Sequence, residues 1–281
     1  MKICVSVADA RAACRALRAG RKRVGLVPTM GALHAGHLSL VRAAKAQCGG
    51  VVVSIFVNPT QFGPAEDFAK YPRPLEADCA ALEKEDVDIV FAPEVEEMYP
   101  KDAMTWVTVE ALSNKLDGGS RPGHFRGVTT VVSKLFHVIE PDAAFFGQKD
   151  AAQLAVIRRL VRDLNFAVEI VACPIVREPD GLAMSSRNAY LSSEDRRRAL
   201  VLSRSLRQVE SAFRAGERDA RALAQSGHAV VAEEPQVRLD YFEIVDPDTL
   251  DPVAQVTHKT LVAVAAYVGA TRLIDNIVLT S

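Results

Sequence analysis

The stretch RVGLVPTMGALHAGHLSLV, from Arg23 to Val41, decides the fold that this sequence predicts. It opens with a short apolar run that suits a buried strand, and Pro28, Gly31 and Gly36 then mark a turn. The apolar residues that follow recur at the spacing of a helix. A strand, a glycine-containing turn and a helix start together point backbone N–H groups and the positive end of a helix dipole toward an anion.

Two histidines lie at the start of this predicted helix. His34 and His37 are three residues apart, so both imidazoles can point to one side of the helix. Two neutral donors beside a helix N-terminus suit phosphate oxygens whose negative charge grows during a reaction. For a lone histidine we would favour a simpler interpretation, a helix cap or a surface residue. The H-x-G-H spacing, together with the strand and both glycines, favours the phosphate site.

Strand-like and helix-like segments alternate around this stretch. Apolar runs typical of strands occupy residues 24–28, 51–57, 87–91, 105–109, 143–146 and 167–173, and helical patterns begin near residue 37 and cover 75–84, 128–139 and 150–162. This order indicates βαβ units and an α/β fold with a Rossmann-like parallel sheet. A short strand and an amphipathic helix that ends at Gly20 precede it.

The pattern changes after Pro174, where two prolines and a glycine interrupt the alternation. We therefore expect two domains, residues 1–175 and residues 176–281. The second is predicted to be a smaller α+β domain, with helices from about residue 193 and over 219–232 and strands over 237–245, 260–268 and 271–279. We expect it to act as a lid over the first domain, with the loop 184–187 near the hinge.

Composition limits the classes of function. The 281 residues carry a net charge of −1, which disfavours nucleic acid as the main partner. No apolar run approaches the roughly 20 residues that a helix needs to cross a bilayer, and charges interrupt the N-terminus too early for a signal peptide. The five scattered cysteines fit neither a disulfide framework nor a zinc site, which predicts a reducing, cytoplasmic location.

Polar side chains follow the strand at 51–57, where ligands of parallel sheets bind. Asn58 and Gln61 are uncharged hydrogen-bonding groups in a loop stiffened by Pro59, and they suit a small ligand with hydroxyl groups and a carboxylate. An Asn-Pro turn without a ligand is an equally good interpretation. Further on, Asp78 is either a magnesium contact or a solvated carboxylate at a helix start.

Two later motifs carry phosphate-binding groups. In FFGQKDAAQ, residues 145–153, Lys149 offers a compact positive charge, and Asp150 suits ribose hydroxyls or caps its own helix. Gln153 lies three residues from Asp150 and can face the same ligand. The alternative is an ordinary charged helix N-terminus.

In PIVREPDGLAMSSRN, residues 174–188, two hydroxyls and a guanidinium suit phosphates. These groups belong to Ser185, Ser186 and Arg187, and the alternative is a helix cap followed by a surface arginine. The glycine-rich loop 116–128 carries Arg121, His124 and Arg126. It suits a mobile cationic lid or anion contact, or a surface loop that pairs with a subunit partner, and we assign no role to either arginine.

The motifs together resemble one family. In order they are PTMG-x-L-H-x-G-H, NPTQF, YPR, RPGHFRG, FGQKD-x-x-Q, MSSRN and TRLIDN, and they cover nearly the whole chain. This set is similar to that of the pantoate–β-alanine ligases, which belong to the H-x-G-H nucleotidyltransferase superfamily. The resemblance implies a homodimer that uses ATP with Mg²⁺ to convert pantoate to pantoyl adenylate. β-Alanine then attacks the adenylate, which yields pantothenate, AMP and pyrophosphate.

The resemblance also implies roles for individual residues. The nucleotide would lie on Met30, Gly31, His34, Gly36, His37, Gly147, Gln148, Lys149, Asp150, Val176, Met184, Ser185, Ser186 and Arg187. His37 would be the proton donor or the principal transition-state contact, together with His34. Lys149, Ser185 and Arg187 would bind phosphates. Gly147 and Asp150 would bind the ribose, and the Val176 backbone the adenine. Gln61 and Gln153 would bind pantoate with Asn58 close by, and Gln61 would also contact β-alanine. For Asp78 the two interpretations given above stay open.

Two other interpretations compete with this one. The first is another H-x-G-H enzyme, either a nucleotidyltransferase that stops after transferring AMP or a truncated aminoacyl-tRNA synthetase. The low net charge disfavours tRNA, and NPTQF with the second glutamine disfavours simple transfer. The second is a nucleotide-binding sensor without catalysis, which the intact histidine pair, lysine and serine–arginine set disfavour.

Overall fold

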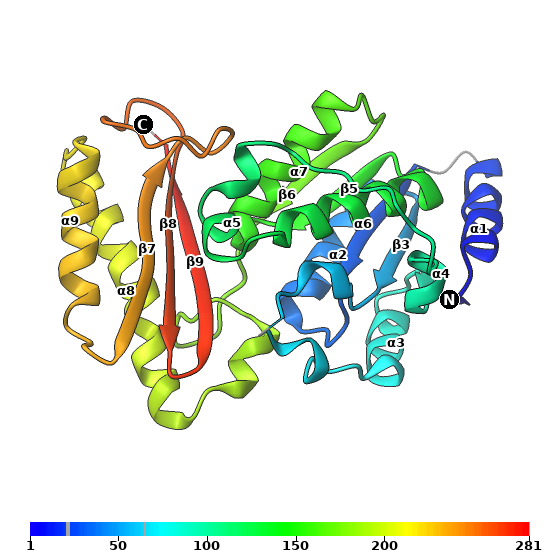
Figure 1. The fold of residues 1–281 in the computed structure, drawn as a ribbon, viewed down its shortest axis with the longest axis horizontal. Coiled ribbons are helices and arrows are strands. Elements are labelled where there is room, and N and C mark those ends of the chain that lie inside the picture. The colour runs from blue at the N-terminus through cyan, green and yellow to red at the C-terminus, as the bar shows by residue number, and fades with distance from the viewer. Residues whose placement is uncertain (21–22, 65, 281) are drawn as a thin grey trace. The chain divides into compact units, whose positions relative to one another are not determined.

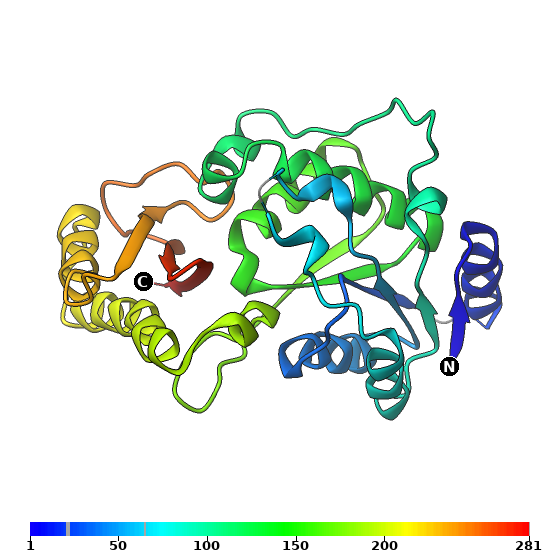
Figure 2. The same ribbon diagram turned by 60° about the horizontal axis from the view of Figure 1, so that its bottom comes forward.

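The computed structural model describes residues 1–20, 23–64 and 66–280, and Figures 1 and 2 show its fold from two directions. The chain divides into two compact units. The first unit comprises residues 1–113, 121–147 and 156–173. The second unit comprises residues 114–120, 148–155 and 174–281.

The first unit contains a six-stranded parallel sheet, as the alternating pattern predicts. Its strand order is β1-β4-β3-β2-β5-β6. The strands are β1 (Lys2–Cys4), β2 (Val24–Thr29), β3 (Gly50–Ile55), β4 (Ile89–Phe91), β5 (Ala143–Gly147) and β6 (Glu169–Cys173). Leu26, Val27, Val52 and Val53 are fully buried although neighbours in a strand face opposite sides, so both faces of the sheet are covered.

The helices that follow these strands are α1 (Val7–Ala19), α2 (Ala35–Gln47), α3 (Leu75–Lys84), α4 (Val95–Met98), α6 (His124–Ile139) and α7 (Ala151–Asp163). On one face of the sheet, α2 and α3 contribute Leu40, Val41 and Leu82 to a core that also contains Val27 and Phe145. Gly20 caps the C-terminus of α1, as expected. No described helix has the length and apolar character that a membrane span requires.

Two expectations for residues 105–128 are wrong. Residues 105–109 do not form a strand. The backbone N–H of Val107 donates to Thr130 Oγ1 (3.0 Å) and its carbonyl accepts from Thr129 Oγ1 (2.6 Å), so side chains of α6 satisfy groups that a sheet would otherwise pair. Residues 116–128 are not all loop either, because α5 (Asp117–Ser120) lies within them and α6 begins at His124.

The second unit pairs two helices with an antiparallel sheet. The helices are α8 (Ser193–Arg214) and α9 (Ala220–Val231), and the sheet has the order β7-β8-β9, with β7 (Val237–Val245), β8 (Thr260–Val268) and β9 (Thr271–Leu279). Figure 1 shows the two helices together beside these three strands. The predicted α+β character and the three strand ranges are confirmed. Leu202, Leu206 and Leu223 from the helices pack against Val262 and Val264 from the sheet.

Candidate active site

The sheet of the first unit reverses its strand order at β2, which lies between β3 and β5. Ligands of parallel sheets bind outside the carboxyl ends of the strands at such a reversal. β2 ends at Thr29 and the H-x-G-H loop follows it, whereas β5 ends at Gly147 and the Gln148–Asp150 turn follows it. The topology therefore directs attention to the two motifs that the sequence marks as phosphate-binding.

His34 and His37 form a reciprocal cap at the start of α2. His34 Nδ1 accepts the backbone N–H of Gly36 (3.1 Å), and His37 Nδ1 accepts the backbone N–H of His34 (3.3 Å). Because both Nδ1 atoms are acceptors, each neutral ring carries its proton on Nε2. The ring centroids lie 4.1 Å apart. Helix capping and a pair of Nε2–H donors are therefore compatible, although the sequence presented them as alternatives.

Asp78 holds the loop before these histidines. Its side chain is 3% exposed, and its carboxylate oxygens accept the backbone N–H groups of Ala32 (2.9 Å) and Leu33 (2.8 Å). The loop needs this support because Gly31 and Ala32 both have positive φ angles, 79° and 49°. Burial raises the pKa of the Asp78 carboxyl, and its two N–H donors offset part of that rise. Asp78 is thus not the solvated carboxylate that one interpretation of the sequence expected.

The same contacts bear on the predicted metal site. Both Asp78 oxygens are engaged by backbone donors. Among the residues that the structure describes, no group of three or more His, Cys, Asp or Glu side chains could hold a metal ion. A magnesium contact at Asp78 therefore stays a prediction.

The loop after β3 links to the H-x-G-H loop through Gln61. Asn58 is 1% exposed, and its Nδ2 donates to Gln61 Oε1 (3.0 Å) and to the carbonyl of Gly127 (3.1 Å). Gln61 Nε2 in turn contacts Met30 Sδ at 3.2 Å. Two of the predicted pantoate residues and one predicted nucleotide residue therefore lie together in the first unit.

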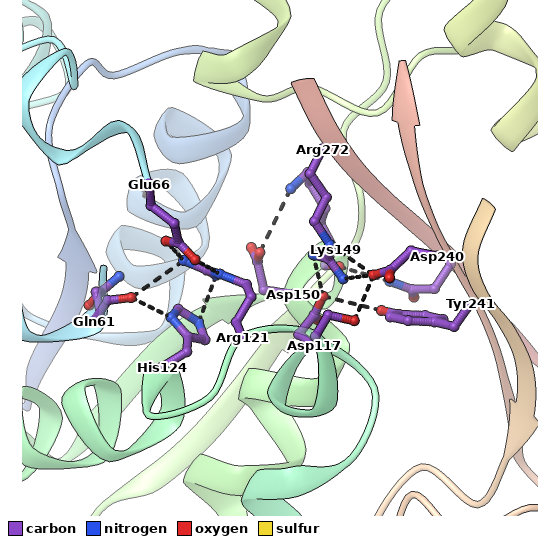
Figure 3. A network of polar contacts seen from close by, with 12 residues as sticks. Gln61, Glu66, Asp117, Arg121, His124, Lys149, Asp150, Asp240, Tyr241 and Arg272 are labelled. Atoms are coloured by element: carbon purple, nitrogen blue, oxygen red, sulfur yellow. Dashed lines mark hydrogen bonds and ion pairs between the residues drawn. The ribbon is translucent and has the colours of Figure 1, made fainter. Parts of the chain in front are cut away.

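Residues at the start of α6 and just before it contact the backbone of Gln61. His124 Nδ1 lies 2.8 Å from the carbonyl oxygen of Gln61, and Arg121 makes a bidentate pair with Glu66 at 2.8 and 2.6 Å (Figure 3). Burial alone would raise the pKa of Glu66, but the Arg121 guanidinium outweighs it and the pKa is lowered. Arg121 thus pairs within its own chain, and Arg126 stacks over Trp106 at 4.3 Å.

Gly127 permits this support because it lies against the backbone of the Gln61 loop. A Cβ atom at residue 127 would lie 2.4 Å from the carbonyl oxygen of Thr60 and 2.6 Å from the backbone nitrogen of Gln61. The sequence left the role of the RPGHFRG motif open, and the structure shows that the motif packs against residues 60–61. Its closely spaced glycines were the only sequence signal of a close approach.

In the second unit, the Gln148–Asp150 turn presents Lys149 beside Asp150. Lys149 Nζ lies 3.7 Å from Asp150 Oδ1, and the lysine side chain is 20% exposed. The turn leads into α7, on which Gln153 is half-buried. In a mostly buried setting, one positive charge next to a helix start suits a phosphate group.

The Val176–Arg187 segment forms a short hairpin and then a capped turn. Arg177 pairs with Ala183 across the hairpin, and the Met184 N–H donates to the Val176 carbonyl (3.0 Å). Ser185 Oγ accepts the Arg187 N–H at 3.3 Å. Ser185 is therefore a cap, as the simpler interpretation of the sequence expected, and the capped turn carries Ser186 and Arg187.

Sequence reasoning missed a charged cluster in the second unit. Arg272 on β9 binds Asp117 Oδ1 (2.7 Å) and Asp240 Oδ2 (2.8 Å), and Tyr241 also contacts Asp117 (3.3 Å; Figure 3). Arg272 is only 14% exposed. Burial, together with the Asp117 carboxylate, holds the pKa of Tyr241 well above its ordinary value. Charged residues within the apolar TRLIDN strand were a signal that could have revealed this cluster.

Comparisons with known proteins match nearly the whole chain to one family. The family model of pantoate-beta-alanine ligase matches residues 2–278. A pantothenate synthetase from Acidobacterium capsulatum is 64% identical over 290 residues, which cover 99% of this chain and 97% of that protein. Another, from Pseudothermotoga lettingae, is 55% identical over 279 residues and 99% of both chains.

Solved structures lead to the same family. The crystal structure of pantothenate synthetase from Thermus thermophilus has a TM-score of 0.94 at 47% identity and covers 99% of both chains. The pantoate-beta-alanine ligase from Francisella tularensis, complexed with beta-gamma ATP and beta-alanine, has a TM-score of 0.82 at 34% identity and covers 99% of this chain and 97% of its own. The chain therefore belongs to the pantoate–β-alanine ligase family.

Proposed function

We propose that this chain condenses pantoate with β-alanine at the expense of ATP, giving pantothenate, AMP and pyrophosphate through a pantoyl adenylate. The observation that carries the proposal is the match to this family over residues 2–278. The Francisella tularensis relative, whose structure was solved with beta-gamma ATP and beta-alanine, supports the choice of ATP and β-alanine as two of the substrates.

In the first step, a pantoate carboxylate oxygen attacks the α-phosphorus of ATP and pyrophosphate leaves. His34 and His37 would donate from Nε2 to phosphate oxygens, because both Nδ1 atoms are engaged in the α2 cap. Charge develops on those oxygens in the transition state, so fixed donors stabilise it without reorganising. We assign the principal contact to His37. Mg²⁺ would enter with ATP and neutralise part of the phosphate charge.

Residues of the second unit would complete the nucleotide site. Lys149, Ser185 and Arg187 would bind phosphates, with Ser186, Gln148 and Met184 close by. Asp150, together with Gly147 at the end of β5 in the first unit, would bind the ribose, and the Val176 backbone would bind the adenine edge. This requires the domain at 176–281 to close over the domain at 1–175 as a lid, which would protect the adenylate from water.

Gln61 would bind the pantoate carboxylate through Nε2. Asn58 already donates to Gln61 Oε1, which turns the NH₂ group of Gln61 toward Met30 Sδ. A thioether sulfur is a weak acceptor, so a carboxylate oxygen can replace it with a gain in hydrogen-bond strength. Gln153 would hold the other end of pantoate, and Gln61 would also contact β-alanine. We further propose a homodimer in the cytoplasm, as the family resemblance implies.

Isotope exchange between pyrophosphate and ATP tests this proposal. Exchange should require pantoate and should proceed without β-alanine, because the adenylate forms before the amine attacks. AMP should accumulate only when pantoate and β-alanine are both present with ATP. Exchange that appears only with β-alanine would contradict a separate adenylation step. Product carrying AMP that is never released would indicate a simple nucleotidyltransferase, and ATP binding without any exchange would indicate a sensor.

A further inference from the structure

Two adjacent buried polar residues lie in the middle of β9. Asp275 is 3% exposed and Asn276 is 2% exposed, although the strand is otherwise largely apolar. Neighbouring residues of a strand point to opposite faces of the sheet. Asp275 is on the same face as Leu273 and Leu279, which belong to the hydrophobic core, and Asn276 is on the other face. Such polar groups are costly to bury unless they are fully hydrogen-bonded.

Asn276 binds the turn that carries Lys149. Its Nδ2 donates to the backbone carbonyls of Gln148 (3.0 Å) and Lys149 (2.9 Å), and its Oδ1 accepts from Gln148 Nε2 (3.2 Å). The two carbonyls can only accept, so they determine which end of the Asn276 amide is the NH₂ group. One side chain thus fixes two consecutive peptide groups directly before Asp150.

Asp275 binds the hairpin that leads to Ser185. Arg177 makes a bidentate pair with it, at 2.6 Å to Oδ2 and 2.9 Å to Oδ1. Arg177 Nη1 also donates to the carbonyl of Gly181 (3.1 Å), which ties the tip of the hairpin to its base. A bidentate pair on a buried carboxylate is geometrically restrictive, because the planar guanidinium fork fits the carboxylate in few orientations.

We propose that Asp275 and Asn276 are positioning residues that hold the Lys149 turn and the Ser185 hairpin to one strand of the second unit. Because consecutive strand residues face opposite sides, a single dipeptide can reach both segments at once. The inference rests on the proposed function, in which Lys149, Ser185 and Arg187 bind the same triphosphate. Neither β9 residue would touch the nucleotide. Both would act through the two segments that they bind.

The variant Asn276→Asp tests the first contact. It keeps the size of the side chain but turns a carboxylate oxygen toward two carbonyl oxygens. We expect kcat to fall by about 10- to 100-fold, since misplacement of a binding group by about 1 Å costs up to about 100-fold. KM for pantoate should not change. Amide hydrogen exchange over residues 148–153 should become faster in the folded variant. A folded variant with wild-type kcat and wild-type exchange would overturn the inference.

Three further variants complete the experiment. Asn276→Ser retains one hydroxyl donor and should show an intermediate loss, so the test survives if Asn276→Asp does not fold. Arg177→Lys weakens the second contact and should speed exchange over residues 177–188 rather than 148–153. Thr260→Val is the matched control, since Thr260 is fully buried in the adjacent strand β8 and its hydroxyl donates to the His258 carbonyl. The control should keep kcat.

Failure of the proposed function would be visible before any variant is compared. In that case the wild-type chain would release no pyrophosphate when given ATP and pantoate. The positioning inference alone would fail if the wild type is active and the folded β9 variants match it in kcat and in amide hydrogen exchange.

Discussion

Replacing Gly127 by alanine should have two opposing effects on stability: a gain in helix propensity and a steric clash with the Gln61 loop. Gly127 lies within α6, and alanine in a helix is more favourable than glycine by about 1 kcal/mol. The new Cβ would lie 2.4 Å from the carbonyl oxygen of Thr60, which is 0.6 Å short of the 3.0 Å that real Cβ contacts respect. The obstructing atoms are backbone, so a rotamer change cannot relieve the clash.

The substitution should change both the stability and the activity of the protein. Overpacking of this kind costs about 1–3 kcal/mol, so after the helix gain we expect a net loss of stability of about 0–2 kcal/mol. The larger effect should be on activity, because α6 and the Gln61 loop must separate. The His124–Gln61 and Asn58–Gly127 hydrogen bonds cross that contact. A misplacement of 0.6 Å should lower kcat/KM for pantoate about tenfold.

Initial rates of pyrophosphate release at varied pantoate, with ATP and β-alanine both saturating, would measure this loss. KM for ATP should stay at the wild-type value. Gly63→Ala is the control, since a Cβ there would make only ordinary contacts of 3.6 Å with Glu66 and the residue has no positive φ. If Gly127→Ala retains wild-type kcat/KM for pantoate and loses about 0–2 kcal/mol of stability, the close approach at Gly127 does not position the Gln61 loop.

Three other changes give further tests. His37→Ala should lower kcat by about 100-fold or more, as removal of one transition-state donor does, with a much smaller change in KM for ATP. A variant with normal turnover in steady-state assays would disprove its assigned role. Asp78→Asn should lower the free energy of unfolding, measured in urea, by about 1–3 kcal/mol. Both carboxylate oxygens of Asp78 accept backbone N–H groups, and the NH₂ group of asparagine would face one of those donors. An unchanged unfolding midpoint would show that the loop does not depend on the carboxylate. Glu178 has a pKa lowered below 4.5, first by its hydrogen bond to Arg196 and further by Asn188. The stability it contributes should therefore be present above pH 4.5 and be lost as pH falls through the lower folded-state pKa. In thermal melts, Glu178→Gln should be less stable than wild type at neutral pH by no more than about 1 kcal/mol, and the difference should disappear in acid. A difference that persists in acid would contradict this assignment.

Much of the fold was predictable because its signals are local. The alternating strand and helix segments, the cap at Gly20 and the three strands of the second unit follow from periodicity and turn residues within short windows. The segment at 105–109 shows the limit of this approach. Its alternation matches a strand, but two threonines more than 20 residues away satisfy the backbone of Val107. A local pattern carries no information about such partners.

By itself, the sequence determined the parallel α/β order, the two-part organisation of helices and strands, and the chemical groups available for phosphates and a small acid. These properties depend on residue type and spacing along the chain. Only the tertiary structure decided that Asp78 binds the loop 46 residues before it, that Gly127 lets α6 reach the Gln61 loop, and that β9 binds two distant segments. The physical reason is that a hydrogen bond or a close backbone approach depends on positions in space, which residues far apart in the chain acquire only on folding.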